Sequence, residues 1–302
     1  MNSLDPDPTA PYGDTVPGPD PLPTLERWTA FPSGPGGGNP AGVWIGAQFP
    51  PPDVMQQIAA DLGYSETAFL RSTPAPGRWV VRYFSPAAEV DFCGHATIAA
   101  AIALGRRHRA GTFHFATAVG DVTVVVRHDD DAVNATLTSV EPRRRDVSPE
   151  LLDQVLEAMY LTPEYLDDDL QPDVAFAGAW HLVLPLRSRD DLARLHYDFD
   201  RLAQIMTAEQ LTTVQAVWRE HPHRFHSRNP FPVGGIVEDP ATGAAAAALG
   251  GYLRIHRHVA APADVTIIQG VDMGRPSLIA VHVPINGGIS VTGTAIEIPT
   301  AP

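Results

Sequence analysis

The chain has 302 residues, one cysteine (Cys93) and 21 basic residues, every one of them an arginine. Without lysine, the chain can form neither a Schiff base nor a P-loop of the GxxxxGK[ST] pattern. A single cysteine also excludes a two-thiol acid–base pair and any multi-cysteine zinc or iron–sulfur site. Proton chemistry is therefore left to carboxylates, histidine, tyrosine and one thiol.

Charge and apolar pattern limit the partners and the compartment. The formal net charge of −14 argues against a nucleic-acid partner, which needs a basic face. No apolar run reaches the roughly 18 residues that span a membrane, and no signal-peptide pattern opens the chain. One cysteine gives no disulfide framework, so we expect a cytoplasmic protein. The length favours about two domains.

Residues 1–23 form a separate compositional zone. They hold seven prolines, four aspartates and no basic residue. Such a segment buries too little apolar surface to offset the entropy lost on ordering. We predict a disordered extension that takes no part in the chemistry.

Strand-like and helix-like patterns alternate after Thr24. A helix is predicted over 53–63, with Asp53 as its N-cap and a glycine at its end. A second follows the cap Ser148 to about Tyr160, and an amphipathic third covers 190–206. The segment 142–147 is interpreted as a linker between two halves. Strands are predicted at 79–84, 113–126, 132–137, 175–186, 213–219, 265–269, 278–283 and 289–298.

Two further helical segments, 94–105 and 241–252, are apolar on all sides. A helix without a polar face is buried on every side, so each is expected at the centre of a curved sheet. Aligning 96–105 with 241–250 gives eight identities in ten positions, a count that alanine richness inflates. We favour an internal duplication. The alternative is two unrelated alanine-rich helices.

The starts of these two buried helices are the expected binding site. Each start exposes about four unpaired N–H groups and a partial positive charge, which suits a carboxylate. Gly94 and Gly243 allow a ligand to approach the backbone closely. His95 and Asp239 place titratable groups beside the same starts.

Each titratable candidate has a structural alternative. His95 is a general acid or base, or a histidine that only bonds a neighbouring strand. Asp239 precedes a proline and can cap the second helix, or do chemistry as well. Cys93 is a thiolate activated by the helix end, or a buried inert thiol. A two-thiol racemase would need a second cysteine at the other helix, where the chain has residues 238–240 instead.

Other polar residues are weaker candidates on local grounds. Glu66 precedes an apolar strand start, where a glutamate is usually solvated. Asn39 lies in a glycine-rich turn, which can line a site. The histidines at 221, 223, 226, 256 and 258 could suggest a metal site, but a solvated loop is the preferred interpretation.

Five ordered motifs resemble the PhzF-like phenazine biosynthesis isomerase family, within the wider diaminopimelate epimerase-like superfamily. They cover residues 38–43, 65–69, 81–97, 238–243 and 269–277. The resemblance implies an α+β fold of two pseudo-symmetric domains, each a mixed β barrel around a central buried helix. The domains are expected at 24–145 and 146–302, with the last strand able to pack back on the first domain.

The resemblance also implies a cofactor-free, metal-free isomerase, usually a homodimer, that acts on a small carboxylate. Glu66 matches the glutamate that shuttles a proton within a dihydro-hydroxyanthranilate ring, and His95 and Asp239 match supporting residues. One departure is Ala244, where many relatives carry serine. Another is the segment 228–235, which can reshape one wall of the pocket. Substrate contacts are expected at Asn39, Ser65, Gly94, Ala96, Thr242, Gly243 and Ala244.

Three functions stay open on the sequence. The first is a proton shift by one base, Glu66. The second is epimerisation or racemisation by two opposed groups, such as Glu66 with Asp239 or Cys93. The third is ligand binding without turnover.

Overall fold

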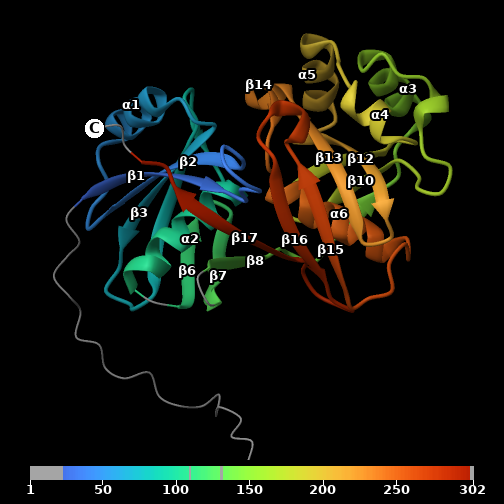
Figure 1. Ribbon diagram of the computed structural model, residues 1–302. Coiled ribbons are helices and arrows are strands. Elements are labelled where there is room, and N and C mark those ends of the chain that lie inside the picture. The colour runs from blue at the N-terminus through green and yellow to red at the C-terminus, as the bar shows by residue number, and fades with distance from the viewer. Residues whose placement is uncertain (1–22, 109, 130–131, 300–302) are drawn as a thin grey trace, which may run out of the picture.

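The structure, a computed structural model, describes residues 23–108, 110–129 and 132–299 (Figure 1). The extension predicted at 1–23 lies, apart from Pro23, outside these residues. Within them the chain forms two lobes whose strands are hydrogen-bonded into one continuous set. None of the helices found there is both long and apolar enough to cross a membrane.

Eight strands close on themselves to form the first barrel. They are, in pairing order, β1 (Thr24–Ala30), β2 (Asn39–Gly46), β3 (Glu66–Ser72), β4 (Arg78–Phe84), β6 (Gly111–Thr117), β7 (Gly120–Asp129), β8 (Ala132–Thr138) and β17 (Ser290–Glu297). β17 pairs with both β8 and β1, which closes the ring. β2 with β3 and β4 with β6 are parallel pairs, and the other neighbours are antiparallel. The last strand of the chain therefore belongs to the first barrel.

A second curved sheet follows the same plan. Its strands, in pairing order, are β9 (Arg143–Arg145), β10 (Asp173–Phe176), β11 (Trp180–Pro185), β12 (Thr213–His221), β13 (Arg224–Phe231), β15 (Ala263–Gln269) and β16 (Ser277–Val283). β16 then pairs with the first residues of β17, so β17 joins both sheets (Figure 1). The parallel pairs here are β11 with β12 and β13 with β15.

The two halves repeat one order of elements. In each, a parallel strand pair is followed by an antiparallel strand, a short strand, a buried helix and a second parallel partner. The short strands are β5 (Glu89–Val90) and β14 (Ile236–Asp239), and the buried helices are α2 (Gly94–His108) and α6 (Gly243–Ile255). This repeat confirms the predicted fold of two pseudo-symmetric α+β barrels. The boundary near residue 145 stays a prediction.

Small residues let the strands approach the buried helices closely. Every residue of α2 from His95 to Gly105 is buried, as is nearly all of α6. A methyl group on Gly105 would lie 2.6 Å from Cγ1 of Val126, and one on Gly250 would lie 2.9 Å from Cγ2 of Ile289. Because real Cβ contacts are almost never this short, both positions need glycine.

The helix starts give the register of the duplication. α2 begins at Gly94 and α6 at Gly243, which are 149 positions apart, whereas the alanine-based alignment pairs residues 145 positions apart. The difference of four residues is about one helical turn. The alanine match is therefore one turn out of register, and Thr242 takes the place of Cys93.

The outer helices correct two sequence predictions and confirm a third. α1 (Pro52–Leu62) has Pro51 at its N-cap, so Asp53 lies in the first turn instead. The single helix predicted over 190–206 is two helices, α4 (Arg189–Ala193) and α5 (Phe199–Ala208), because Asp198 caps a new start with its side chain. Ser148 does cap α3 (Pro149–Ala158), as predicted. Three short 3₁₀ turns complete the helical segments: η1 (Pro163–Tyr165), η2 (Pro232–Gly234) and η3 (Val271–Met273).

Several strand boundaries also differ from the prediction. The segments 113–126 and 175–186 are each two antiparallel strands, because tight turns interrupt the apolar runs. The linker 142–147 contains β9, which pairs with β10. His221 and His226 lie on β12 and β13, so the loop expected at these two positions is wrong, whereas His223 lies in the exposed turn between the two strands, as expected.

Candidate active site

Asn39 joins the two halves of the site. It is the first residue of β2 and is 1% exposed. Its Nδ2 donates to Oδ1 of Asp239 at 2.6 Å and to the carbonyl oxygen of Ala241 at 3.2 Å, and lies 3.0 Å from Nδ1 of His95. Because Nδ2 faces two oxygen acceptors, the orientation of the carboxamide is fixed.

That orientation sets the tautomer of His95. A neutral imidazole has one donor and one acceptor nitrogen, and Nδ1 faces a group that can only donate. The proton of the neutral ring therefore sits on Nε2. Nε2 lies 3.4 Å from Oε2 of Glu66 and 3.3 Å from Oγ of Ser65. His95 thus presents an N–H group to the candidate base.

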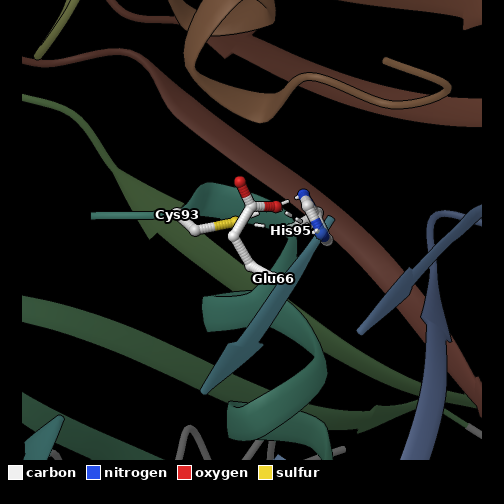
Figure 2. Close-up of side chains that lie close together, drawn as sticks. All are labelled: Glu66, Cys93 and His95. Atoms are coloured by element: carbon white, nitrogen blue, oxygen red, sulfur yellow. Dashed lines mark hydrogen bonds and ion pairs between the residues drawn. The ribbon is translucent and has the colours of Figure 1, made fainter. Parts of the chain in front are cut away.

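Glu66 is the first residue of β3 and points at the start of α2. Figure 2 shows its carboxylate beside the Cys93 sulfur and the His95 ring, above the first turn of that helix. The Glu66 side chain is 13% exposed and opens to a hollow of about 80 Å³. Both halves line this hollow, through Gly63, Tyr64, Ser65, Glu66, Pro86, Phe231, Gly234 and Ile236. A small molecule there would touch Glu66 directly.

A larger hollow of about 510 Å³ lies elsewhere, between the loop 34–37, Arg275 and the end of β17. It contains none of the predicted site residues. The smaller hollow, which is lined by Ser65 and Glu66, is therefore the candidate substrate site.

Asp239 is the last residue of β14, 5% exposed, and both of its oxygens accept hydrogen bonds. Oδ1 accepts from Asn39, and Oδ2 accepts from the Thr242 hydroxyl at 2.6 Å. Burial raises the pKa of Asp239 to about 6; the charge of Glu66 adds to the rise, while His95 and the two hydrogen bonds oppose it. Asp239 is thus held in place by neighbours and titrates close to neutral pH.

The starts of the two buried helices meet, as predicted. A methyl group on Gly94 would lie 3.6 Å from the backbone nitrogen of Ala244 and 3.8 Å from Cα of Gly243. Ala96 is buried one residue after His95, and its backbone N–H bonds to the Cys93 thiol. The two helix starts thus lie against each other, which puts two partial positive charges in one place.

Cys93 is a buried thiol rather than a thiolate. Burial raises its pKa well above the ordinary value, and the charge of Glu66 raises it further, although the N–H of Ala96 opposes this. Its sulfur lies 3.3 Å from Nδ1 of His95. A thiol of this kind is a poor base near neutral pH.

Glu66, Cys93 and His95 also form the one group of the described residues whose donor atoms lie close enough to hold a metal ion, within 4.8 Å of one another. In this arrangement the His95 nitrogens are engaged by Asn39 and Ser65. The tautomer that Asn39 selects leaves a proton on Nε2, the nitrogen nearest Glu66, and that proton would have to leave before a metal could bind there. The expectation of a metal-free and cofactor-free site stays a prediction.

The second half lacks a counterpart of either Glu66 or Cys93. β3 begins at Glu66 and the equivalent strand β12 begins at Thr213. α2 follows Cys93, and α6 follows Thr242. Two neutral threonines thus occupy the positions related by the internal repeat, and the ionisable group that the second half brings to the site is Asp239.

Two further contacts were not expected from the sequence. Gln269, 1% exposed, accepts from the N–H of Thr242 through Oε1 and donates through Nε2 to the backbone oxygen of Asp239 at 2.6 Å. Phe231 and Ile236 bring apolar walls from the second half to Glu66. A polar residue closing an apolar strand was the available signal for Gln269. No local sequence pattern indicated that Phe231 and Ile236 would line the hollow.

The remaining histidines lie in other surroundings. His226 contacts Glu220, and His256 contacts Asp173 at 2.7 Å. His256 and His258 stack on each other, with ring centroids 5.7 Å apart. None of them belongs to the group described above.

Comparison with known proteins shows the family of the chain. Residues 28–300 match the family described as phenazine biosynthesis-like protein. An uncharacterized isomerase of Bacillus subtilis, YfhB, is 30% identical over 282 residues, which are 89% of this chain and 94% of that protein. The trans-2,3-dihydro-3-hydroxyanthranilate isomerase of Pseudomonas fluorescens is 31% identical over 82% of this chain and 86% of its own length.

Solved structures share the fold. A PhzF-family protein of Bacillus anthracis matches with a TM-score of 0.81 at 22% identity, over 91% of this chain and 96% of its own. A probable proline racemase of Agrobacterium radiobacter matches with a TM-score of 0.64 at 12% identity, over 93% of each chain. The fold and site define a two-barrel isomerase of the diaminopimelate epimerase-like type. The chain belongs to the PhzF, or phenazine biosynthesis-like, family and is an isomerase.

Proposed function

We propose that this isomerase moves a proton within a small carboxylate substrate, with Glu66 as the only base. The observation that carries the proposal is that Glu66 is the one carboxylate among the described residues that line the shared hollow, where it faces a His95 N–H, while both oxygens of Asp239 are engaged by Asn39 and Thr242. A single base on one face suits a shift along that face better than inversion of a centre.

In the proposed reaction the Glu66 carboxylate takes a proton from a carbon next to an unsaturated or carboxylate-bearing group. The Nε2–H of His95 stabilises the carboxylate before the transfer. Protonated Glu66 then returns the proton to another carbon on the same face. The proton that leaves one carbon of the substrate is added to another, so the reaction needs no cofactor.

The substrate carboxylate is assigned to the converging helix starts. Backbone N–H groups at Gly94, Gly243 and Ala244 supply donors and the positive ends of two helices. Asn39, Ser65 and Thr242 are assigned to holding His95 and Asp239 in place, which their hydrogen bonds support. Ala244 can offer only its backbone.

The first substrate to test is trans-2,3-dihydro-3-hydroxyanthranilate, because the Pseudomonas fluorescens relative is named for its isomerisation. We also retain the predictions of a cytoplasmic homodimer without a nucleic-acid partner.

The test follows this substrate, and a panel of small unsaturated carboxylates, by proton NMR in D₂O. We expect isomerisation with little deuterium entering the product. We also expect Glu66→Gln to lower the rate by at least about 100-fold while the circular dichroism spectrum is unchanged. Glu164→Gln, an exposed glutamate, is the matched control. A fully active Glu66→Gln variant would refute the assignment, and deuterium at an inverted centre would favour an epimerase.

A further inference from the structure

Directly behind Asp239 lies an ion pair that the proposed reaction does not use. Arg228 on β13 and Glu238 on β14 are joined by hydrogen bonds from Nε and Nη2 of the arginine to both carboxylate oxygens, the shortest at 2.6 Å. The two side chains are only 14% and 4% exposed. A forked pair of this kind is geometrically specific and, with both charges present, neutral overall.

The third nitrogen of Arg228 reaches the helical layer. Nη1 donates to the backbone oxygens of Leu192, Ala193 and Leu195, at 3.0 to 3.2 Å. These carbonyls lie at and just after the C-terminal end of α4, and the oxygen of Leu192 also accepts from the N–H of Leu195. One arginine therefore links α4 to the strand that ends in Asp239.

On its outer side β14 has few contacts among the described residues. It has four residues and pairs only with β13, with an irregular register between Pro230 and Phe231. Its outer side is held by Arg228 and by the Tyr197 hydroxyl, which donates to the backbone oxygen of Val237. The position of Asp239 therefore depends on these outer contacts as well as on its hydrogen bonds with Asn39, Thr242 and Gln269.

We propose that Arg228 and Glu238 are positioning residues, which fix β14 so that Asp239 meets Asn39 and which keep the net charge behind Asp239 at zero. The proposal rests on the proposed function only in so far as Asp239 serves catalysis. Arg228 opens the segment 228–235 that departs from the family pattern, and the proposal gives that arginine a role.

Asp239 is flanked by charged and titratable groups from both sides. On the site side these groups come from β3 and the start of α2, and on the outer side from β13, β14 and the segment before α5. They are Glu66, Cys93, His95, Arg228, Glu238 and Tyr197, while Asn39 and Thr242 are neutral hydrogen-bond donors to Asp239. Of these, Arg228 and Glu238 are the two whose charges cancel and can be removed one at a time.

The test compares Arg228→Gln, Glu238→Gln and the double variant. Removing Arg228 leaves a buried anion near Asp239 and should raise its pKa relative to the double variant. Removing Glu238 leaves a cation and should lower it, each by about half a pH unit or more. The pKa is read directly from carbon-13 NMR of labelled aspartate carboxyls, assigned with Asp239→Asn, so no substrate is needed. Arg201→Gln, which breaks an exposed pair with Glu157, should leave it unchanged.

The positioning role of Arg228 and Glu238 is tested by the rate of isomerisation. We expect the double variant to keep the Asp239 pKa near its original value but to lose at least 10-fold in kcat, with a smaller change in KM. A buried unpaired charge can prevent folding. If either single variant fails to fold for this reason, Arg228→Lys replaces it. Lysine keeps the positive charge but cannot form the two parallel hydrogen bonds to Glu238, so this variant should lower kcat without moving the Asp239 pKa.

Shifts in the same direction for both single variants, or none, would overturn the charge role. An unimpaired rate in the double variant would overturn the positioning role. Opposite shifts in an enzyme inactive on every carboxylate would leave the charge role standing while the proposed function fails. An active enzyme in which neither single variant shifts the Asp239 pKa would leave the proposed function standing while the charge role fails.

Discussion

Asn39 donates a hydrogen bond to Asp239 across 2.6 Å, although the two residues are 200 positions apart in the chain. The bond joins the first residue of β2 in one barrel to the last residue of β14 in the other sheet. The same Nδ2 selects the tautomer of His95. The candidate site is thus complete only when the two halves are docked.

The first prediction concerns this bond. Asn39→Asp replaces the donor by an acceptor that faces the Asp239 carboxylate, so it should place two like charges in a buried site. We expect the isomerase rate to fall by at least about 100-fold and the free energy of unfolding to fall by about 1–3 kcal/mol. Steady-state rates and urea unfolding measure the two effects. Asn286→Asp, an exposed change of the same kind, should alter neither. An active Asn39→Asp enzyme would show that the bridge is dispensable.

The second prediction uses the two glycines that open the buried helices. A methyl group on Gly94 would point at the backbone nitrogen of Ala244, whereas one on Gly243 would face the ring of Phe31 and the side chain of Val291 at 3.7–3.9 Å. Both are ordinary contact distances, so both alanine variants should fold. Gly94→Ala should weaken carboxylate binding by about 10-fold or more, because the methyl group occupies the anion position. Gly243→Ala should bind as the parent does.

Isothermal titration with the substrate, or with a slow carboxylate analogue, compares the two glycine variants. Equal affinity in both would mean that the substrate carboxylate lies away from the helix starts. Tighter binding by Gly94→Ala than by Gly243→Ala would contradict the assignment outright.

The third prediction separates one-base chemistry from two-base chemistry that uses the Cys93 thiol. Because burial and Glu66 keep the Cys93 thiol protonated, Cys93→Ala should retain the rate within about threefold. The pH dependence of kcat/KM should keep its shape. A loss of 100-fold, together with slower deuterium entry at one carbon, would instead identify Cys93 as a second acid or base.

Much of this arrangement could be predicted from the sequence, because local chemistry specifies it. The apolar, alanine-rich helices predict burial, and buried helix starts predict an anion site. His95 and Asp239 follow from their places beside those starts. Glu66 does not, because a glutamate before a strand is usually solvated; the family resemblance singled it out.

Other features depend on contacts that no local pattern encodes. The hydrogen bonds of Asn39 reach across 200 positions, and the pocket wall at Phe231 comes from the opposite half. The break between α4 and α5 was hidden, because the apolar spacing continues through the second cap, Asp198. The alanine-rich helices indicated a duplication, but the many alanines also allowed an alignment that is one helical turn away from the true register.

The last prediction is the pH dependence of stability. The Asp239 pKa in the folded chain, about 6, lies above the ordinary value of 3.8. Over that interval the folded chain binds more protons than the unfolded chain, so stability falls as the pH rises. The stabilisation is fully present below pH 3.8 and is lost by the time the pH has passed 6. The two-unit difference corresponds to roughly 3 kcal/mol.

Asp239→Asn removes this titration but keeps the shape of the side chain. The difference in unfolding free energy between parent and variant should therefore shift by about 2.4 kcal/mol in favour of the variant as the pH rises from about 4 to 7. Urea midpoints at four pH values within that range measure it. Asp190→Asn, an exposed aspartate, is the control and should run parallel to the parent. If the Asp239→Asn curve also ran parallel, Asp239 would carry an ordinary pKa, and burial would not be what tunes it.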